Sequence, residues 1–167
     1  MSHIIQNAEK LNQKYNHIDQ TVKDRETNAQ AWKDACVDFH ETYDILAFPG
    51  GLAKAIELLK NQDAATISIA IIYLHADPYF HRSGYIKQTI IRLLKKAHLS
   101  QEQIAPLQEV LLLAIQHNGR REFIEYCRLA NKITNAQFEQ QIQKIITHAY
   151  DPRIISRAQQ MLDAAKK

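Results

Sequence analysis

Glycine, proline and cysteine are scarce in this chain, and long apolar runs are missing. There are four glycines, four prolines and two cysteines among 167 residues. So few turn-forming residues, beside abundant Ala, Gln, Leu, Ile and Lys, favour helices over a sheet protein with many tight turns. Without a run of about 20 apolar residues, we expect no membrane span. The first ten residues lack the basic and apolar regions of a secretory signal, so we expect a cytoplasmic protein.

Apolar residues recur at helical spacing along the chain, which predicts an all-α fold of about eight or nine helices. The expected helices cover about residues 2–24, 30–46, 52–60, 64–74, 84–97, 104–115, 119–133, 138–149 and 151–165. Capping boxes, in which two side chains satisfy free amides at a helix start, are expected at Thr27–Gln30, Ser100–Gln103 and Thr134–Gln137. Pro49-Gly50-Gly51 and Asn118-Gly119 are expected to end the helices before them.

The cysteines and the single tryptophan fall on these apolar stripes. A disulfide between Cys36 and Cys127 is one possibility, but two buried thiols in a reducing compartment are favoured. Arg128 stands beside Cys127, and a cation can lower a thiol pKa and make the thiol reactive. The stripe position of Cys127 instead predicts an inert thiol. Trp32 can be a ligand platform, but its spacing favours a core residue.

Residues 64–74 are the ambiguous stretch. Thr66-Ile67-Ser68-Ile69 alternates like a strand and is rich in β-branched residues, which favours a sheet. A lone strand would find no partner strand in this chain, and its backbone groups would stay unsatisfied. We therefore predict a central helix that is apolar on nearly all sides.

The chain is organised around residues 75–97. Asp77-Pro78 opens an aromatic connector there, Ser83-Gly84 breaks it, and an amphipathic run follows. An Asp-Pro pair returns at 151–152, where Pro suits a first helical position. Units that start near 77, 118 and 151 are spaced by 41 and 33 residues, as in helical repeats. We predict one domain over 1–167, with 1–48 as N-terminal capping helices and 50–167 as stacked helix pairs.

The segment Asp151-Pro152-Arg153-Ile154-Ile155-Ser156-Arg157-Ala158, leading to Leu162, resembles the second helix of a HEAT repeat. That repeat has Asp before an apolar pair, then Arg and Ala, then Leu. The resemblance covers residues 151–165 and is loose over 77–97. It implies a right-handed α-α superhelix of stacked helix pairs. HEAT-like proteins are mostly partner-binding scaffolds; one bacterial branch consists of alkylpurine DNA glycosylases, whose catalytic pattern does not align here.

Basic residues are concentrated in the second half of the chain. Residues 1–80 hold seven Lys and Arg against eleven Asp and Glu, whereas residues 81–167 hold fourteen against seven. On the helices expected there, one face of each carries a basic ridge: Gln88, Arg92, Lys95 and Lys96; then Arg121, Glu125, Arg128 and Lys132; then Arg153 and Arg157. Equivalent helices of a stack line one wall, so the ridges are expected to merge into a basic stripe. The alternative is that these Lys and Arg residues are ordinary solvent-facing helix residues that bind no partner.

No catalytic motif is present: the sequence has no phosphate-binding loop, no HExxH, no paired-cysteine metal site and no Gly-x-Ser-x-Gly elbow. His75, Asp77 and His81 can be imagined around a metal with a hydrolytic water. Their spacing matches no zinc signature, and Pro78 interrupts any shared helical face, so polar helix caps are favoured instead. We expect no enzyme activity, no metal and no small-molecule cofactor.

The sequence favours a non-catalytic protein that binds an acidic protein partner through the basic stripe. Tyr79 and Phe80, beside Arg82, are the candidate aromatic anchors, because aromatic residues and Arg dominate binding hot spots. Stapling of the connector onto its neighbours is the alternative role for both aromatics. One concrete version is a bacterial immunity or antitoxin-type protein. The alternative function is nucleic-acid binding, with the same stripe on phosphates.

Overall fold

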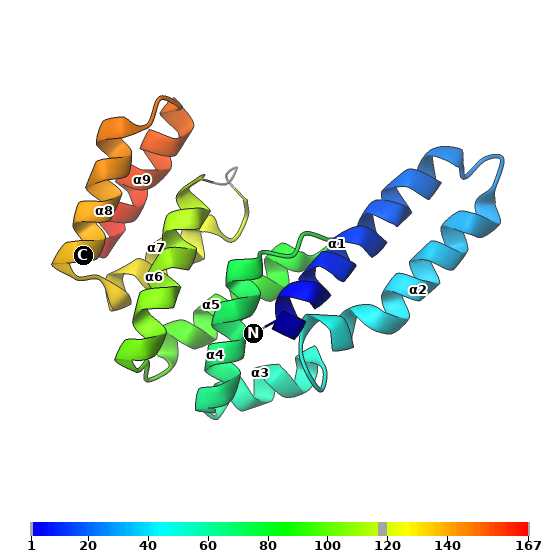
Figure 1. Cartoon of the computed structure of the whole chain (residues 1–167), viewed down its shortest axis with the longest axis horizontal. Coiled ribbons are helices and arrows are strands. Elements are labelled where there is room, and N and C mark those ends of the chain that lie inside the picture. The colour runs from blue at the N-terminus through cyan, green and yellow to red at the C-terminus, as the bar shows by residue number, and fades with distance from the viewer. Residues whose placement is uncertain (1, 117–119, 167) are drawn as a thin grey trace. The chain divides into compact units, whose positions relative to one another are not determined.

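The computed structural model describes residues 2–116 and 120–166 of the chain, and every regular element in those residues is a helix (Figure 1). The elements are α1 (Ser2–Thr21), η1 (Val22–Asp24), α2 (Ala29–Ala47), α3 (Leu52–Lys60), α4 (Ala64–Ala76), α5 (Ser83–Lys96), α6 (Gln101–Gln116), α7 (Phe123–Ile133), α8 (Ala136–His148) and α9 (Pro152–Ala165). The all-α prediction is confirmed. The expected stop at Asn118-Gly119 lies outside the described residues.

The contacts gather into two compact units, residues 1–83 and residues 84–167. In the first unit, α1 and α2 run side by side as a long hairpin (Figure 1), and α1 also packs on α4. In the second unit, α6 packs on α7 and α8, while α9 packs on α7 and α8. The single-domain organisation expected from the sequence stays a prediction.

The central helix predicted at 64–74 is confirmed as α4. Asp63 caps it, and its carboxylate Oδ1 accepts hydrogen bonds from the Thr66 backbone amide at 2.8 Å and from the Thr66 hydroxyl at 2.6 Å. These bonds, the hydroxyl bond first, lower the pKa of Asp63. Ile67, Ala70 and Leu74 are buried. Burial and a good cap override the strand preference of the β-branched residues.

Two of the three predicted capping boxes are displaced by one residue. Asn28 and Asn135, rather than Thr27 and Thr134, cap α2 and α8: their side-chain oxygens accept from Ala31 N at 3.2 Å and from Phe138 N at 2.8 Å. Asn caps at least as well as Thr, so the helix begins after the Asn. The third box is confirmed in its reciprocal bond, because the Gln103 side chain accepts from Ser100 N at 3.0 Å.

The displaced cap gives a stability prediction. We expect Asn135→Ala to lower the free energy of unfolding by about 1 kcal/mol, because it leaves the Phe138 amide without its acceptor. Thr134→Ala, one residue earlier, should cost less than about 0.5 kcal/mol. Urea denaturation of both variants checks this, and a larger loss at Thr134 would restore the predicted box.

The two Asp-Pro pairs behave differently. Asp151 caps α9, accepting from Arg153 N at 2.8 Å, and Pro152 takes the first helical position as predicted. Asp77 instead ends α4 in the left-handed conformation (φ 47°), and α5 begins only at Ser83. The connector between them is tied down locally, because Asn12 Oδ1 of α1 accepts from the Tyr79 amide at 2.7 Å.

Candidate binding surface

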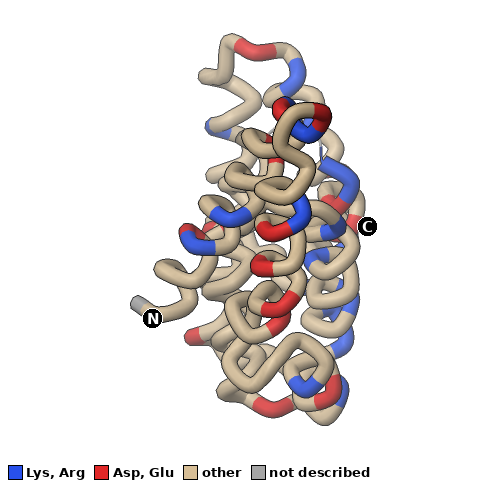
Figure 2. Tube along the Cα trace, turned by 90° about the vertical axis from the view of Figure 1, so that its right-hand side faces the viewer, with Lys and Arg blue, Asp and Glu red and all other residues tan. Residues whose placement is uncertain are grey.

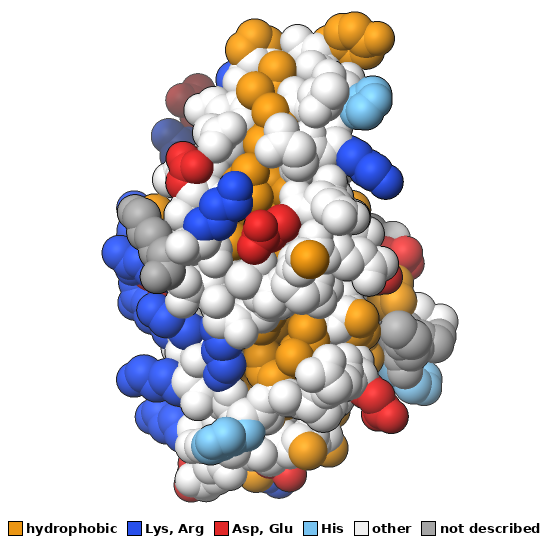
Figure 3. All heavy atoms as spheres, turned by 90° about the vertical axis from the view of Figure 1, so that its left-hand side faces the viewer, with side chains coloured by type: hydrophobic (Ala, Val, Ile, Leu, Met, Phe, Trp, Pro, Cys, Tyr) orange, Lys and Arg blue, Asp and Glu red, His pale blue; other side chains and the backbone are white. Residues whose placement is uncertain are grey.

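The residues predicted to bind divide between the two units. On or just before α5, α7 and α9 of the second unit lie Gln88, Arg92, Lys95, Lys96, Arg121, Arg128, Lys132, Arg153 and Arg157, whereas Tyr79, Phe80 and Arg82 lie in the first unit. Figure 2 marks the Lys and Arg positions along the chain, and Figure 3, seen from the opposite side, shows Lys and Arg side chains gathered along one edge of the face that it draws. The second unit therefore holds the candidate surface.

Hydrogen bonds join the first two basic ridges. Gln88 on α5 donates through Nε2 to the Arg121 carbonyl at 3.1 Å. At the other end of α5, the Lys132 ammonium of α7 donates to the Lys95 carbonyl at 2.8 Å. Residues of α5, α7 and α9 line a common groove, so all three ridge helices meet in this unit.

Glu125 lies beneath the ridge rather than on it, because its side chain is 3% exposed. Two guanidinium groups cover it. Arg92 donates to its Oε1 through Nε at 3.0 Å and Nη2 at 2.7 Å, and Arg128 donates through Nη1 at 2.9 Å. These bonds, those from Arg92 first, hold the pKa of Glu125 below its usual range although burial opposes them. The prediction of a solvent-facing Glu125 is wrong, since local spacing cannot reveal Arg92 on another helix.

Two further cations of the ridges cap neighbouring helices. Lys132 donates to the carbonyls of Leu94, Lys95 and Ala97 at the end of α5. Arg157 donates through Nε to the Ile115 carbonyl of α6 at 2.7 Å. Cations at helix C-termini satisfy free carbonyls and complement the helix dipole. Desolvation at its site lowers the pKa of Lys132.

The remaining basic residues differ in how firmly they are held. The guanidinium carbon of Arg121 stands 4.4 Å from the centre of the Tyr85 ring, a cation–π contact. Arg153 pairs with Asp151, the cap of its own helix. Lys95 and Lys96 are exposed and make no ion pair within residues 2–116 and 120–166, so their ammonium groups are available to a partner.

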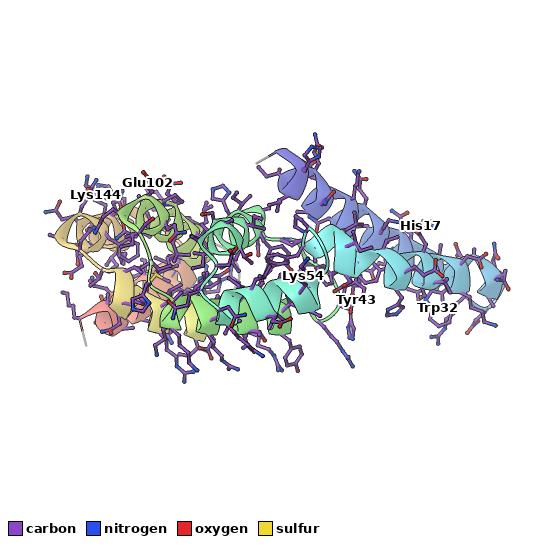
Figure 4. The ribbon with its side chains drawn as sticks, turned by 90° about the horizontal axis from the view of Figure 1, so that it is seen from below. His17, Trp32, Tyr43, Lys54, Glu102 and Lys144 are labelled. Atoms are coloured by element: carbon purple, nitrogen blue, oxygen red, sulfur yellow. The ribbon has the colours of Figure 1, made fainter. Side chains whose placement is uncertain are left out.

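A groove of about 810 Å³ runs between these helices. Its lining comes from Lys95 of α5, from Ile124, Cys127, Arg128 and Asn131 of α7, and from Ser156, Gln159, Gln160, Asp163 and Ala164 of α9. Figure 4 shows α7 and α9 in one layer and α6 and α8, with Glu102 and Lys144, in the other. The groove therefore combines cations, amides and an exposed isoleucine on the layer that carries the basic ridges.

The sequence prediction missed a buried ion pair between α5 and the start of α7. The Lys87 side chain is 0% exposed, and its ammonium lies 3.7 Å from Oε1 of Glu122, which is 5% exposed. Lys87 belongs to the stripe of α5 that continues through Ile90, Ile91 and Leu94, all buried. The sequence does contain a signal for this pair: a lysine falls on the apolar stripe of a helix, and a buried lysine requires an acidic partner on a neighbouring helix.

Both cysteines are free thiols, so the disulfide alternative is not realised. Burial raises the pKa of the Cys127 thiol to about 12, although it borders the groove. A thiol in this state is not a nucleophile at neutral pH. Arg128, which the sequence places beside Cys127, forms its ion pair with Glu125.

The connector residues are placed differently from the prediction. Phe80 is 3% exposed and packs against Phe39 and Tyr43, with ring centroids 5.6 Å and 6.4 Å away. It belongs to the core of the first unit and is not available as a surface anchor, because it packs on the aromatic residues of α2. Tyr79 is exposed, with its ring 6.2 Å from that of Tyr15, and Arg82 is exposed.

Within the described ranges, no group of three or more His, Cys, Asp or Glu is placed to hold a metal ion, His75, Asp77 and His81 included. No helix between residues 2 and 116 or between 120 and 166 has the length and apolar character needed to cross a bilayer.

Comparison with known proteins yields no match to a protein-family model, a curated protein or a solved structure. The functional proposal therefore depends on the surface described above.

Proposed function

We propose that this chain is a non-catalytic binding protein whose 84–167 unit holds an acidic protein partner on the face formed by α5, α7 and α9. The observation that carries the proposal is the groove between these helices, where the cations Lys95 and Arg128 stand beside an exposed Ile124. Protein interfaces combine such apolar and charged groups, and charge complementarity steers the encounter.

The way the cations are held favours a protein partner over nucleic acid. Arg92 and Arg128 share Glu125, while Lys132 and Arg157 are turned to backbone carbonyls. Phosphate binding depends on many cations that neutralise the backbone together. Lys132 and Arg157, which already donate to carbonyls inside the unit, contribute less to such contacts, and the apolar lining of the groove has no role on a phosphate backbone.

The architecture we propose is a HEAT-like stack of helix pairs. Support comes from the packing of α6 on α7 and of α8 on α9, with α7 against α9 and α6 against α8. One concrete version of the function is a bacterial immunity or antitoxin-type protein acting in the cytoplasm without a cofactor. Such proteins are small and lack catalytic motifs, although immunity proteins against nucleases tend to be acidic and this chain is half basic.

Nucleic-acid binding is the second candidate. The excess of Lys and Arg in residues 81–167 and the adjacent exposed Lys95 and Lys96 favour it. Neutralised phosphates release counterions, so this reading requires an affinity that falls steeply with salt.

A charge-reversal pair separates the candidates. We compare wild type, Lys95→Glu/Lys96→Glu, and a control of equal charge change, Lys144→Glu/Lys166→Glu, with α8 carrying Lys144 (Figure 4). Arg92, Arg128 and Lys132 are left intact because their reversal would disturb the unit itself. Each protein is titrated with duplex and single-stranded oligonucleotides at low and moderate salt, and is used in a pull-down from its own cells.

We expect an acidic protein recovered by wild type and by the control, but lost with Lys95→Glu/Lys96→Glu, and oligonucleotide binding that disappears at about 0.15 M salt. Micromolar oligonucleotide binding at that salt, lost in the same variant, would make nucleic acid the function. If both charge-reversal variants recover the partner protein as well as wild type does, the basic face does not bind it.

A further inference from the structure

The lining residues of the groove between α5, α7 and α9 span a length that suits about two turns of a helix. Its lining residues on α7 are Ile124, Cys127, Arg128 and Asn131, and on α9 they are Ser156, Gln159, Gln160, Asp163 and Ala164. Both sets follow the three- and four-residue spacing of one helix face over about two turns, or roughly 11 Å. A partner helix of similar length can lie along them, with anchors at three- and four-residue spacing.

Part of the groove lining is apolar, and one of its apolar side chains is exposed. Ile124 is 42% exposed, one of the few large apolar side chains outside the core, and the small residues Cys127 and Ala164 stand with it in the lining. The exposed part of the Ile124 side chain can be covered by an apolar side chain from outside. Fully desolvated apolar anchors of this kind carry most of the energy of helix-in-groove binding.

The two sides of the groove carry opposite charges. Lys95 and Arg128 stand on the α5 and α7 side, whereas Asp163 stands on the α9 side. Glu125 engages only Nη1 of Arg128, so the exposed remainder of that guanidinium still has donors for a carboxylate. A ligand that matches this pattern is acidic along the edge that faces α5 and α7 and is neutral or basic along the edge that faces α9.

We propose that this groove binds a single amphipathic α-helix of the partner protein, with an apolar stripe over Ile124 and acidic side chains toward Lys95 and Arg128. The inference rests on the proposed function and gives the partner a secondary structure and a charge pattern. The amides of Asn131 and Gln160 also line the groove and suit polar groups at the edges of such a helix, whereas Gln159 donates through Nε2 to Asp163 Oδ1 at 2.8 Å.

The probe is a fluorescent peptide of about 18 residues, with Leu at three- and four-residue spacing, Glu along one neighbouring edge and Gln elsewhere. Two comparison peptides carry Lys for every Glu, or Ser for every Leu. Fluorescence anisotropy at about 0.15 M salt should show the acidic peptide bound at least about tenfold more tightly than either comparison peptide.

Groove variants test the position. Ile124→Asp removes the apolar anchor and Gln160→Trp fills the groove without changing charge; each should weaken the acidic peptide at least about tenfold. Leu113→Asp on α6, at a leucine that is 38% exposed against 42% for Ile124, is the matched control and should leave binding unchanged. Circular dichroism and urea denaturation establish that each variant is folded before titration.

The outcomes separate the inference from the function on which it rests. Binding of the acidic peptide that survives both groove variants but is lost in Lys95→Glu/Lys96→Glu overturns the groove and keeps the basic face. No preference for the acidic peptide, while the pull-down still depends on Lys95 and Lys96, overturns the helical ligand alone. A concentration-dependent dimer, seen by analytical ultracentrifugation and abolished by Ile124→Asp, would make a second copy of this chain the occupant and overturn the partner helix.

Discussion

Replacing Lys87 by Met is expected to lower the free energy of unfolding by about 3 to 5 kcal/mol. The ammonium of Lys87 is fully buried and lies 3.7 Å from Oε1 of Glu122, which is itself buried. Without the lysine, the buried Glu122 carboxylate loses the ammonium that pairs with it, and that is the costly state of a broken buried pair. Urea or guanidinium denaturation monitored by circular dichroism measures the loss.

Two controls give this result its meaning. Lys95→Met makes the same chemical change at an exposed position of the same helix and should cost less than about 0.5 kcal/mol. The double variant Lys87→Met/Glu122→Leu should be more stable than Lys87→Met alone, because it removes the uncompensated carboxylate. A loss at Lys87 no larger than at Lys95 would show that the pair is not buried in solution.

The helices were predictable because their periodicity and caps act locally. The helix prediction for the stretch of α4 is confirmed, since the described residues 2–116 and 120–166 contain no strand that could pair with it. The caps were misplaced by one residue at Asn28 and Asn135 because Thr and Asn stand side by side there and both can cap. Local chemistry fixes such a boundary only to within a residue when two capping residues are adjacent.

The face of α5 was only partly predicted. Ile90 and Leu94 are buried as expected, but Ile86 and Leu93 are only half-buried, and Lys87 takes the remaining core position. Helical spacing identifies a stripe to within one residue on either side. Spacing alone does not place Lys87 in the core, because a charged side chain is expected to face solvent. Its burial depends on the ion pair with Glu122, which lies 35 positions later in the chain.

The basic ridge residues of the candidate surface were predictable from helical spacing, but their contacts were not. The ridges of α5, α7 and α9 lie in one unit, and α5 and α9 each lend residues to the groove beside α7. What the sequence does not show is that Arg92 and Arg128 converge on Glu125 or that Lys132 caps α5. These contacts join residues on separate helices, and they decide which cations remain available to a partner.

Glu125→Gln is expected to cost about 2 kcal/mol of unfolding free energy near neutral pH, because it weakens charged hydrogen bonds from two arginines. Arg92 first, and then Arg128, keep the pKa of Glu125 below its ordinary 4.5 in the folded protein. For a carboxyl with a lowered folded-state pKa, the stabilisation is fully present above the unfolded-state pKa and is lost as pH falls through the folded-state pKa.

The stability difference between wild type and Glu125→Gln should therefore be constant from neutral pH down to about pH 5 and should shrink at lower pH. Glu109→Gln on α6 removes the same charge from an exposed carboxyl with no ion pair in the described ranges, and it should change stability by less than about 0.5 kcal/mol. Urea denaturation of the three proteins between about pH 3 and pH 7 makes the comparison. A difference that persists undiminished at pH 3 would mean that the Glu125 charge is not what holds Arg92 and Arg128 on this face. In that case packing of the two side chains, and not their ion pairs, would place the basic groups beside the groove.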